Sequence, residues 1–403
     1  MYFCDLYMAE RLRQRAQTAA ALLLAAALTC ALVALAVLMQ PSLNLGRRFY
    51  GAALIITTIG LITWRTAVWS TFSRRSPTRV LVVGGDARAH LVLAELERHA
   101  HLGYSVKALM PGVDRVGWLT AGATAVSTSP LSLVDRLDVA IADPLVRTIV
   151  FTESAHERIP VSDLLRWRMQ GIEIVEFESF YERITGRLPL AQLRESWLVL
   201  APGVARSASR ERLKRLIDLA AAVVIAILAS PIALLAAVAI KLDSPGPVFY
   251  RQRRVGRNGR EFVICKFRSM RDGAERATGA VWAQARDPRV TRVGRIIRAL
   301  RIDELPQLFN VIKGDMSMVG PRPERPEIVA RLIAAIPLYQ YRHSVKPGLT
   351  GWAQVCYPYG ATIEDAQNKL CYDLYYIKNP SLLFDLQIIL QTVKIVLFGR
   401  GAR

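Results

Sequence analysis

RALRIDELPQLFNVIKGDMSMVGPRPER, residues 298–325, sets two adjacent carboxylates, Asp303 and Glu304, among arginines and apolar side chains. Pro306 disfavours a continued helix at the residue before it, so we expect the pair at a helix break where side chains can converge. Two prolines flank Arg322 and stiffen its backbone, and its planar guanidinium can bind a phosphate through two hydrogen bonds. The stretch therefore indicates a site for metal and phosphate.

The chemistry open to this carboxylate pair follows from its basic surroundings. Arg301 and the neighbouring cations would keep both groups ionised. Mg²⁺ prefers one or two carboxylates plus phosphate oxygens to a full protein cage, so the pair suits this ion. One carboxylate could instead attack phosphorus while the other binds metal. An isolated Asp-Glu pair is most often solvated helix surface, so the rest of the chain must decide.

Composition limits the class of protein. The 403 residues are 52% hydrophobic and carry a formal net charge of +20. This length allows two or three domains with cores of their own. The charge implies an anionic partner: nucleic acid, an anionic bilayer surface or a phosphorylated substrate. Five widely spaced cysteines without a CxxC motif indicate neither a zinc site nor a disulfide framework, and a reducing compartment is expected.

Two apolar runs near the N-terminus, residues 16–39 and 49–72, can each cross a bilayer of ~30 Å as a helix. More arginines lie before the first run and after the second than between them, so the positive-inside bias puts both ends in the cytoplasm. No small-residue cleavage site follows the first run, which favours an anchor over a signal peptide. Residues 1–74 are therefore predicted to be transmembrane helices.

Strand-like and helical segments alternate through residues 75–200, which is typical of a Rossmann-like parallel sheet. Its nucleotide signal is incomplete, because Asp86 stands where a dinucleotide fingerprint needs its second glycine. A structural or regulatory sheet is therefore favoured over a working NAD site. Strands are predicted at residues 80–83, 104–110, 148–151 and 172–175, and an amphipathic helix at 87–100.

A third apolar run, residues 216–240, is long enough to span a membrane, but basic clusters flank it on both sides. A spanning helix would put one cluster outside. Pro231 kinks a helix, and the hydroxyl of Ser230 can satisfy a carbonyl that the proline leaves free. We expect a helix, a break and a second helix, forming a re-entrant hairpin in the cytoplasmic leaflet; a kinked spanning helix is the alternative.

Two further segments lie around the carboxylate pair. Residues 243–271 combine turn residues, short strand-like runs and many arginines, which predicts a hairpin that presents cations. Residues 295–312 are amphipathic, with isoleucines and leucines on one side and arginines on the other, and such a segment can lie along a membrane surface. Both segments would place positive charge beside an apolar surface.

From about residue 214 to the C-terminus, the chain resembles the bacterial sugar transferase family, the monotopic polyprenyl-phosphate phosphoglycosyl transferases. Residues 1–200 resemble the long-form members, which usually have four N-terminal membrane helices where this sequence shows two. The matching runs are KRLIDLAAAVVIAILASPIALLAAVAIKLDSPGPVFYRQRRVGRNGREFVICKFRSM, RIDELPQLFNVIKGDMSMVGPRPE, VKPGLTGWAQV and KLCYDLYYIKNPSLLFDLQIILQTV.

The resemblance implies an α/β membrane protein in which a Rossmann-like domain precedes a helix-rich α/β catalytic domain, residues 205–403, with a re-entrant helix and amphipathic interfacial helices. It implies transfer of a sugar-1-phosphate from a UDP-sugar to undecaprenyl phosphate with release of UMP, the first membrane step of exopolysaccharide or O-antigen synthesis. The partners would be these substrates and the lipid bilayer, on the cytoplasmic side of a bacterial inner membrane. A homodimer is a candidate assembly.

The resemblance also implies roles for individual residues. Asp303 would be the nucleophile that forms a covalent phosphosugar intermediate, and Glu304, with Asp303, would bind Mg²⁺. The helix break would lie at Ser230 and Pro231. The residues expected to contact phosphate or substrate are Lys266, Arg268, Arg301, Arg322 and Asp373. The sugar is not set by the sequence, and glucose or galactose is expected before an N-acetylated sugar.

Two other functions are compatible with parts of the sequence. A membrane-anchored Rossmann oxidoreductase or epimerase would bind NAD and keep its activity after Asp303→Asn. A basic module for nucleic acid or anionic lipid would lose binding as salt rises and would depend on no single carboxylate. The arginines cluster beside apolar membrane segments and no nucleic-acid motif is recognised, so no nucleic-acid partner is expected.

Overall fold

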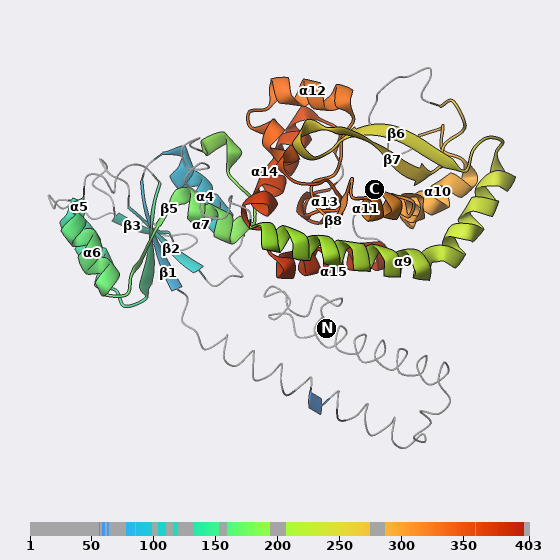
Figure 1. The fold of residues 1–403 in the computed structure, drawn as a ribbon. Coiled ribbons are helices and arrows are strands. Elements are labelled where there is room, and N and C mark those ends of the chain that lie inside the picture. The colour runs from blue at the N-terminus through green and yellow to red at the C-terminus, as the bar shows by residue number, and fades with distance from the viewer. Residues whose placement is uncertain are drawn as a thin grey trace. The chain divides into compact units, whose positions relative to one another are not determined.

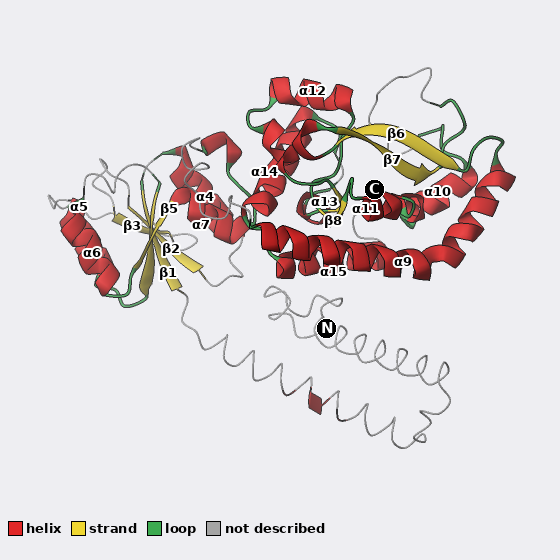
Figure 2. Ribbon diagram, viewed as in Figure 1, coloured by secondary structure: helices red, strands yellow, loops and turns green. Residues whose placement is uncertain are grey.

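The computed structural model divides the chain into two compact units, residues 1–185 and 186–403 (Figures 1 and 2). The predicted transmembrane runs at 16–39 and 49–72 lie outside the described residues, apart from four isolated positions between 56 and 63. The described ranges are 78–84, 86–98, 104–109, 116–119, 133–152, 159–193, 207–274, 287–358 and 360–398.

A five-stranded sheet forms the centre of the first unit, with strand order β3-β2-β1-β4-β5. Every neighbouring pair is parallel except β2 and β3, which are antiparallel. The predicted alternation and parallel sheet are thus confirmed, whereas the edge strand β3 was not predicted. The strands are β1 (Thr78–Val83), β2 (Tyr104–Leu109), β3 (Val116–Leu119), β4 (Val146–Phe151) and β5 (Glu173–Glu176).

Helices cover both faces of this sheet. Val80 and Val82 of β1 pack with α4 and α7, whereas Leu81 and Val83 pack with α5 and α6. Successive side chains of a strand point to opposite faces, so a sheet covered on both faces requires an unbroken apolar run. The helices are α4 (Ala87–Arg98), α5 (Leu133–Ile141), α6 (Val161–Met169) and α7 (Phe177–Thr185).

The second unit surrounds a core to which α9, α11, α12, α14 and α15 all contribute. Its β6–β7 hairpin is antiparallel, as the sequence predicted, and β8 and β9 form a parallel pair. Its elements are η5 (Leu190–Gln192), α9 (Ala208–Asp243), β6 (Phe249–Val255), η6 (Arg257–Gly259), β7 (Glu261–Phe267), α10 (Arg292–Ala299), η7 (Ile302–Glu304), α11 (Gln307–Lys313), β8 (Ser317–Val319), α12 (Pro326–Ala335), η8 (Tyr339–Ser344), β9 (Gly348–Thr350), α13 (Trp352–Cys356), α14 (Ile363–Lys378) and α15 (Leu382–Phe398).

Residues 186–193 contact this second unit, although the sequence placed them in the sheet domain. The Gly186 carbonyl accepts a hydrogen bond from Trp352 Nε1 at 2.7 Å. The Leu188 amide donates to the Cys371 carbonyl at 3.1 Å, and the Leu188 side chain is part of the core. These contacts come from residues far along the chain, so composition near residue 200 could not reveal them.

Helix α9 is 36 residues long and is the one helix in the described part of the chain that is long and apolar enough to cross a membrane. It continues through Pro231 and bends along its course (Figure 1), so the predicted hairpin of two helices is instead one bent helix. Proline has no N–H for the carbonyl four residues earlier, Ile227, and the Ser230 hydroxyl donates to that carbonyl at 2.8 Å. The serine thus lets the helix continue.

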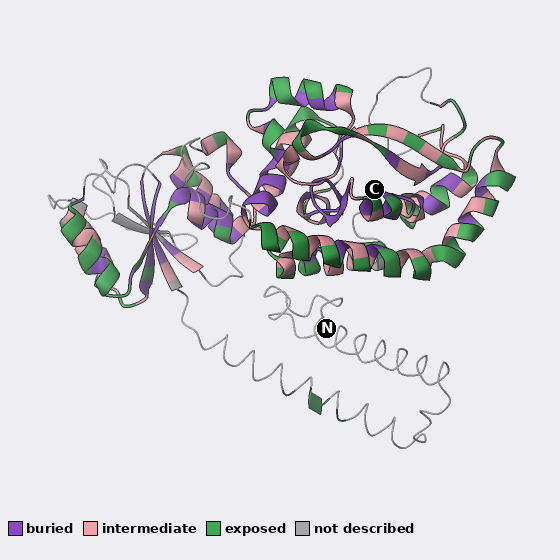
Figure 3. Ribbon diagram, viewed as in Figure 1, coloured by how far each residue is buried: buried purple, intermediate pink, exposed green. Residues whose placement is uncertain are grey.

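Both ends of α9 are attached to the second unit. Near its start, Asp218 accepts a hydrogen bond from the Ser317 hydroxyl of β8 at 2.7 Å. At its end, Asp243 accepts one from the Val293 amide of α10 at 3.0 Å. Much of the helix surface between is exposed (Figure 3), including Leu235 at 71% and Leu242 at 84%. The helix is therefore held to the unit near both ends while much of its apolar surface stays uncovered.

Candidate active site

The carboxylate pair lies at a break between two helices, as Pro306 indicated. Helix α10 ends at Ala299, the pair occupies the 3₁₀ turn η7, and α11 begins at Gln307. Arg301 has a φ of 57°, in the left-handed region, which ends the helical path before the pair. The amphipathic segment predicted at 295–312 is therefore two helices separated by this turn.

Glu304 is surrounded by three of the predicted cations. Its Oε1 lies 2.5 Å from Arg322 Nη2, 3.6 Å from Arg301 Nη1 and 3.7 Å from Lys266 Nζ. Burial alone would raise the pKa of Glu304, but the charges of Arg322 and Lys266 outweigh it and hold that pKa well below its usual range. Glu304 is therefore ionised throughout the physiological range of pH.

Asp303 is shifted in the opposite direction. Its residue is 9% exposed. Burial, and then the charge of Glu304, raise the pKa of Asp303 to about 6, against the opposing effect of Lys266 and Arg322. Neighbouring titratable groups whose pKa values are driven apart can take different chemical roles. Here one carboxylate titrates close to neutral pH beside one that stays charged.

Lys266 comes to the pair from the hairpin, on β7 opposite Tyr250 of β6. Burial lowers the pKa of its ammonium to about 8, and the charge of Glu304 acts against that fall. The ammonium therefore still carries its charge at neutral pH. The structure thus brings Lys266, Arg301 and Arg322 together around Glu304 from three separate parts of the sequence.

Arg268 has another set of partners, although it lies only two residues after Lys266. Its Nη1 donates to the Pro245 carbonyl at 2.8 Å, and its Nη2 donates to the Ser244 carbonyl at 2.7 Å. A guanidinium at a helix C-terminus is favoured by the carbonyls left unpaired there. Arg268 therefore joins the end of α9 to β7, whereas the cations paired with Glu304 are Lys266, Arg301 and Arg322.

Asp373 is connected to the pair through a residue that the sequence analysis missed. Its carboxylate, 2% exposed on α14, accepts hydrogen bonds from Arg342 Nε at 3.1 Å and Nη2 at 2.8 Å. Arg342 also donates from Nη2 to the Arg322 carbonyl at 3.0 Å. One arginine in a chain with 53 lysines and arginines carries no signal of its own, so only the fold could reveal this one.

The turn after β1 is a poor site for a dinucleotide. Asp86 accepts a hydrogen bond from the Ala89 amide at 3.1 Å, so a carboxylate already caps the N-terminus of α4. Gly84 lies against Thr152, and a Cβ at this glycine would be 1.8 Å from the threonine hydroxyl. The Asp86 carboxylate thus takes an amide at the helix N-terminus that could otherwise bind an anion, which argues against the oxidoreductase alternative.

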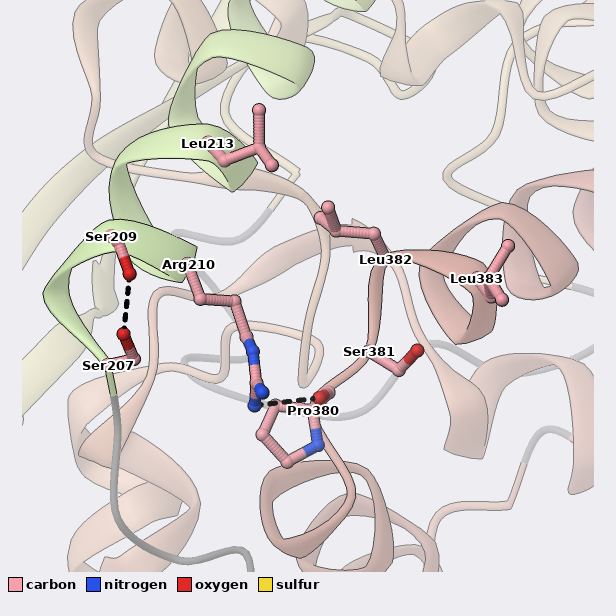
Figure 4. Close-up of a pocket in the computed structure, with 8 residues that line it drawn as sticks. All are labelled: Ser207, Ser209, Arg210, Leu213, Pro380, Ser381, Leu382 and Leu383. Carbon is pink, nitrogen blue, oxygen red and sulfur yellow. Dashed lines mark hydrogen bonds between the residues drawn. The ribbon is translucent and has the colours of Figure 1, made fainter.

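A pocket of about 530 Å³ lies elsewhere in the second unit, beside the start of α9 (Figure 4). Arg210 crosses it and donates to the Pro380 carbonyl at 3.2 Å. The pocket contains no carboxylate and shares no residue with the pair. Its lining residues are Ser207, Ser209, Arg210, Leu213, Pro380, Ser381, Leu382 and Leu383. The pocket therefore lacks the acidic groups that Asp303 and Glu304 supply at the carboxylate pair.

Fold and site together define an α/β protein with a membrane-length helix and a carboxylate pair set among cations, an arrangement suited to phosphate-bearing substrates. Residues 209–399 match the model of the bacterial sugar transferase family. With this match and the relatives below, the chain belongs to that family, which confirms the resemblance seen in the sequence.

Three relatives illustrate the membership. UDP-N-acetylgalactosamine-undecaprenyl-phosphate N-acetylgalactosaminephosphotransferase of Aeromonas hydrophila is 48% identical over 60% of this chain and 56% of its own length. UDP-glucose:undecaprenyl-phosphate glucose-1-phosphate transferase of Caulobacter vibrioides is 49% identical over 45% of this chain and 68% of its own. Exopolysaccharide production protein PSS of Rhizobium leguminosarum is 40% identical over 45% of this chain and 93% of its own length.

The extent of the likeness differs between relatives. The chain spans about half the length of the Aeromonas protein, and 46% of an undecaprenyl-phosphate glucose phosphotransferase from Komagataeibacter xylinus, to which it is 39% identical. It covers nearly all of the Rhizobium protein through an alignment of 186 residues. The part shared with the Rhizobium protein is thus close in size to the second unit.

Proposed function

We propose that this protein transfers a sugar-1-phosphate from a UDP-sugar to undecaprenyl phosphate, giving undecaprenyl-diphosphate-sugar and UMP, and so initiates synthesis of an exopolysaccharide or O-antigen-type glycan. The main support is the pair of adjacent carboxylates with opposite pKa shifts inside a ring of cations. The Aeromonas and Caulobacter relatives are named as transferases that use undecaprenyl phosphate.

The proposed reaction has two displacements at one phosphorus. The Asp303 carboxylate attacks the β-phosphorus of the UDP-sugar. The bond from that phosphorus to the bridging oxygen breaks, and UMP leaves with the electron pair. A phosphate oxygen of undecaprenyl phosphate then attacks the phosphosugar and releases the Asp303 carboxylate. Splitting one transfer into two displacements is the gain from a covalent intermediate.

The cations have a separate role in this scheme. Arg322 and Lys266 lie on the same side of Glu304, within 2.5 and 3.7 Å of its Oε1. Positive groups fixed where negative charge develops stabilise the transition state without having to reorganise. We assign Arg301, Arg322 and Lys266 to the phosphate oxygens of the substrate. Glu304 holds these cations in position before the substrate arrives.

The side chains of the pair fit Mg²⁺ as the cofactor. The described residues contain no group of three or more histidine, cysteine or acidic side chains that could hold a metal alone. Mg²⁺ needs only one or two carboxylates when phosphate oxygens complete its shell. The three cations approach Glu304 most closely at Oε1, so Oε2 and the Asp303 carboxylate are the proposed donors. When bound, the ion would neutralise charge on the phosphates.

We also propose that α9 enters and leaves the cytoplasmic leaflet of a bacterial inner membrane from one side. Support comes from the attachment of both its ends to one unit, through Asp218 and Asp243. Exposed apolar side chains beside the carboxylate pair, Ile296, Leu300 and Phe309, suit the membrane surface. The acceptor's phosphate lies at the headgroup level, so Asp303 must be held there.

The decisive experiment omits the lipid acceptor. The purified protein is incubated with Mg²⁺ and either UDP-glucose or UDP-N-acetylgalactosamine labelled at the β-phosphate, the two sugars named for the relatives. We expect label on the protein, no label on Asp303→Asn, and normal label on the control Asp315→Asn, whose carboxylate pairs with Lys313. Label that persists in Asp303→Asn would refute the assigned nucleophile. If undecaprenyl phosphate is added and neither UDP-sugar gives a lipid-linked product, the proposed function is refuted.

A further inference from the structure

The loop that carries Arg322 is held almost entirely through its carbonyl groups. Pro321 and Pro323 have no N–H to donate, so the loop has few donors of its own. Four successive carbonyls nevertheless have partners. Pro321 O accepts from Gly348 N at 2.9 Å, Arg322 O from Arg342 Nη2 at 3.0 Å, Pro323 O from Arg254 Nη1 at 3.0 Å, and Glu324 O from Val255 N at 2.9 Å.

Arg342 is the most constrained of these partners. It is 6% exposed, and its Nη1 donates to the Tyr339 hydroxyl at 2.6 Å. Its Nε and Nη2 both donate to Asp373 Oδ2. The guanidinium is thus fixed by a carboxylate and a phenol, while Nη2 also reaches the Arg322 carbonyl. A planar fork that serves acceptors in several directions cannot be reproduced by a lysine.

These contacts form a continuous path to the proposed reaction centre. Asp373 orients Arg342, Arg342 holds the main chain of Arg322, and the side chain of Arg322 reaches Glu304 at 2.5 Å. The hydrogen bonds of Arg342 go to Asp373, Tyr339 and Arg322 rather than to the carboxylate pair. The contact of Arg342 with the pair is therefore indirect, through Arg322.

We propose that Arg342 is a positioning residue for sugar-phosphate transfer, which fixes the main chain of Arg322 so that its guanidinium stays directed at Glu304 and the substrate phosphate. This inference rests on the proposed function and adds a residue to it. A buried ion pair such as Arg342–Asp373 is weak support for stability, because desolvation offsets much of its attraction. Its geometry, by contrast, determines where Arg322 can lie.

The test is a double-mutant cycle in the full-length protein, with kcat and KM for the UDP-sugar measured in each variant. We expect Arg342→Lys to lower kcat/KM by about tenfold to a hundredfold, as small displacements of a positioned group do. We also expect KM to rise and kcat to fall in Arg342→Lys. The ratio of these two changes should match the ratio measured for Arg322→Lys. If Arg342 acts only through Arg322, the double variant should be within about twofold of Arg322→Lys alone.

A milder variant protects the test against loss of folding. Tyr339→Phe removes one hydrogen bond from Arg342 and keeps the ring, which lies 5.0 Å from the guanidinium carbon. It should show a smaller loss in the same direction and the same lack of additivity with Arg322→Lys.

The possible outcomes separate this inference from the function on which it rests. If the losses in kcat/KM of the two single variants multiply in the double variant, Arg342 does not act through Arg322 and the proposal is overturned. If KM is unchanged and kcat falls only in proportion to the amount of folded protein, Arg342 has a merely structural role, which also overturns the proposal. If the wild type turns over and Arg342→Lys has the same kcat and KM, the role of Arg342 is refuted while the proposed function stands. A wild-type protein that forms no lipid product would overturn the proposed function and this inference with it.

Discussion

Arg322 Nη2 lies 2.5 Å from Glu304 Oε1, and this contact joins the proline-flanked loop to the carboxylate pair. Arg301 and Lys266 approach the same oxygen. Glu304 therefore compensates three cations that are brought together within a partly buried site. Its charge is needed for the fold of the site as well as for its chemistry.

Glu304→Gln should accordingly reduce both stability and activity. Removing the carboxylate takes away the closest negative charge beside three cations, so we expect the free energy of unfolding to fall by roughly 1–3 kcal/mol. Sugar-phosphate transfer should fall by at least about a hundredfold. Denaturant unfolding and a transfer assay on the same preparation measure the two effects. Unchanged stability would contradict the view of Glu304 as the centre of the cation cluster.

Asp303→Asn should abolish transfer and yet stabilise the protein at neutral pH. The pKa of about 6 in the folded protein exceeds the ordinary value of 3.8, so the wild type loses stability as pH rises through 6. The variant has no such loss, and its advantage should grow from pH 4 to about pH 7 and reach roughly 1–3 kcal/mol.

Unfolding of Asp303→Asn and the wild type is compared across this pH range with EDTA present, so that a metal does not alter the titration. An advantage that is constant with pH would show that Asp303 does not titrate as described. A variant less stable than wild type at pH 7 would also contradict the prediction.

The two ends of α9 should be accessible from the same side of the membrane. Single cysteines replacing Ser207 and Arg253, in a background without the native cysteines, should both resist an impermeant maleimide added outside intact spheroplasts. Both should react after permeabilisation. Labelling of one but not the other from outside would show that α9 spans the bilayer, and would overturn the proposed re-entrant arrangement.

Ser230→Ala should be costly only while Pro231 is present. The serine hydroxyl satisfies the Ile227 carbonyl at 2.8 Å, and its loss should lower stability by about 1 kcal/mol. Alanine at position 231 restores the backbone N–H for that carbonyl. Ser230→Ala should therefore have almost no effect in a Pro231→Ala background, as thermal unfolding in detergent can measure. Equal losses in both backgrounds would exclude this role for the hydroxyl.

Much of the fold was predictable because its signals are local. The apolar run at 80–83 predicted β1, the proline at 306 predicted the helix break, and the alternation of aromatic residues with arginines predicted the β6–β7 hairpin. The serine–proline step correctly indicated how a freed carbonyl would be satisfied. In each case neighbouring residues, rather than distant ones, determine the conformation.

The errors have the opposite origin. A proline was expected to divide α9, but contacts at its two ends and the Ser230 hydroxyl keep one bent helix. The carbonyls that Arg268 contacts at the end of α9 were also not predicted, because only the folded chain brings them to it. Arg342 was missed because its partners lie 20 and 31 residues away, at Arg322 and Asp373.

The hydrogen bonds from Arg268 to Ser244 and Pro245 have a mechanical consequence. They join the end of the apolar helix to the strand that carries Lys266, only two residues away from Arg268. We expect a displacement of that helix end, such as a thicker bilayer would impose, to shift the cation beside Glu304 as well. We expect the turnover rate to vary with the acyl-chain length of the surrounding lipid.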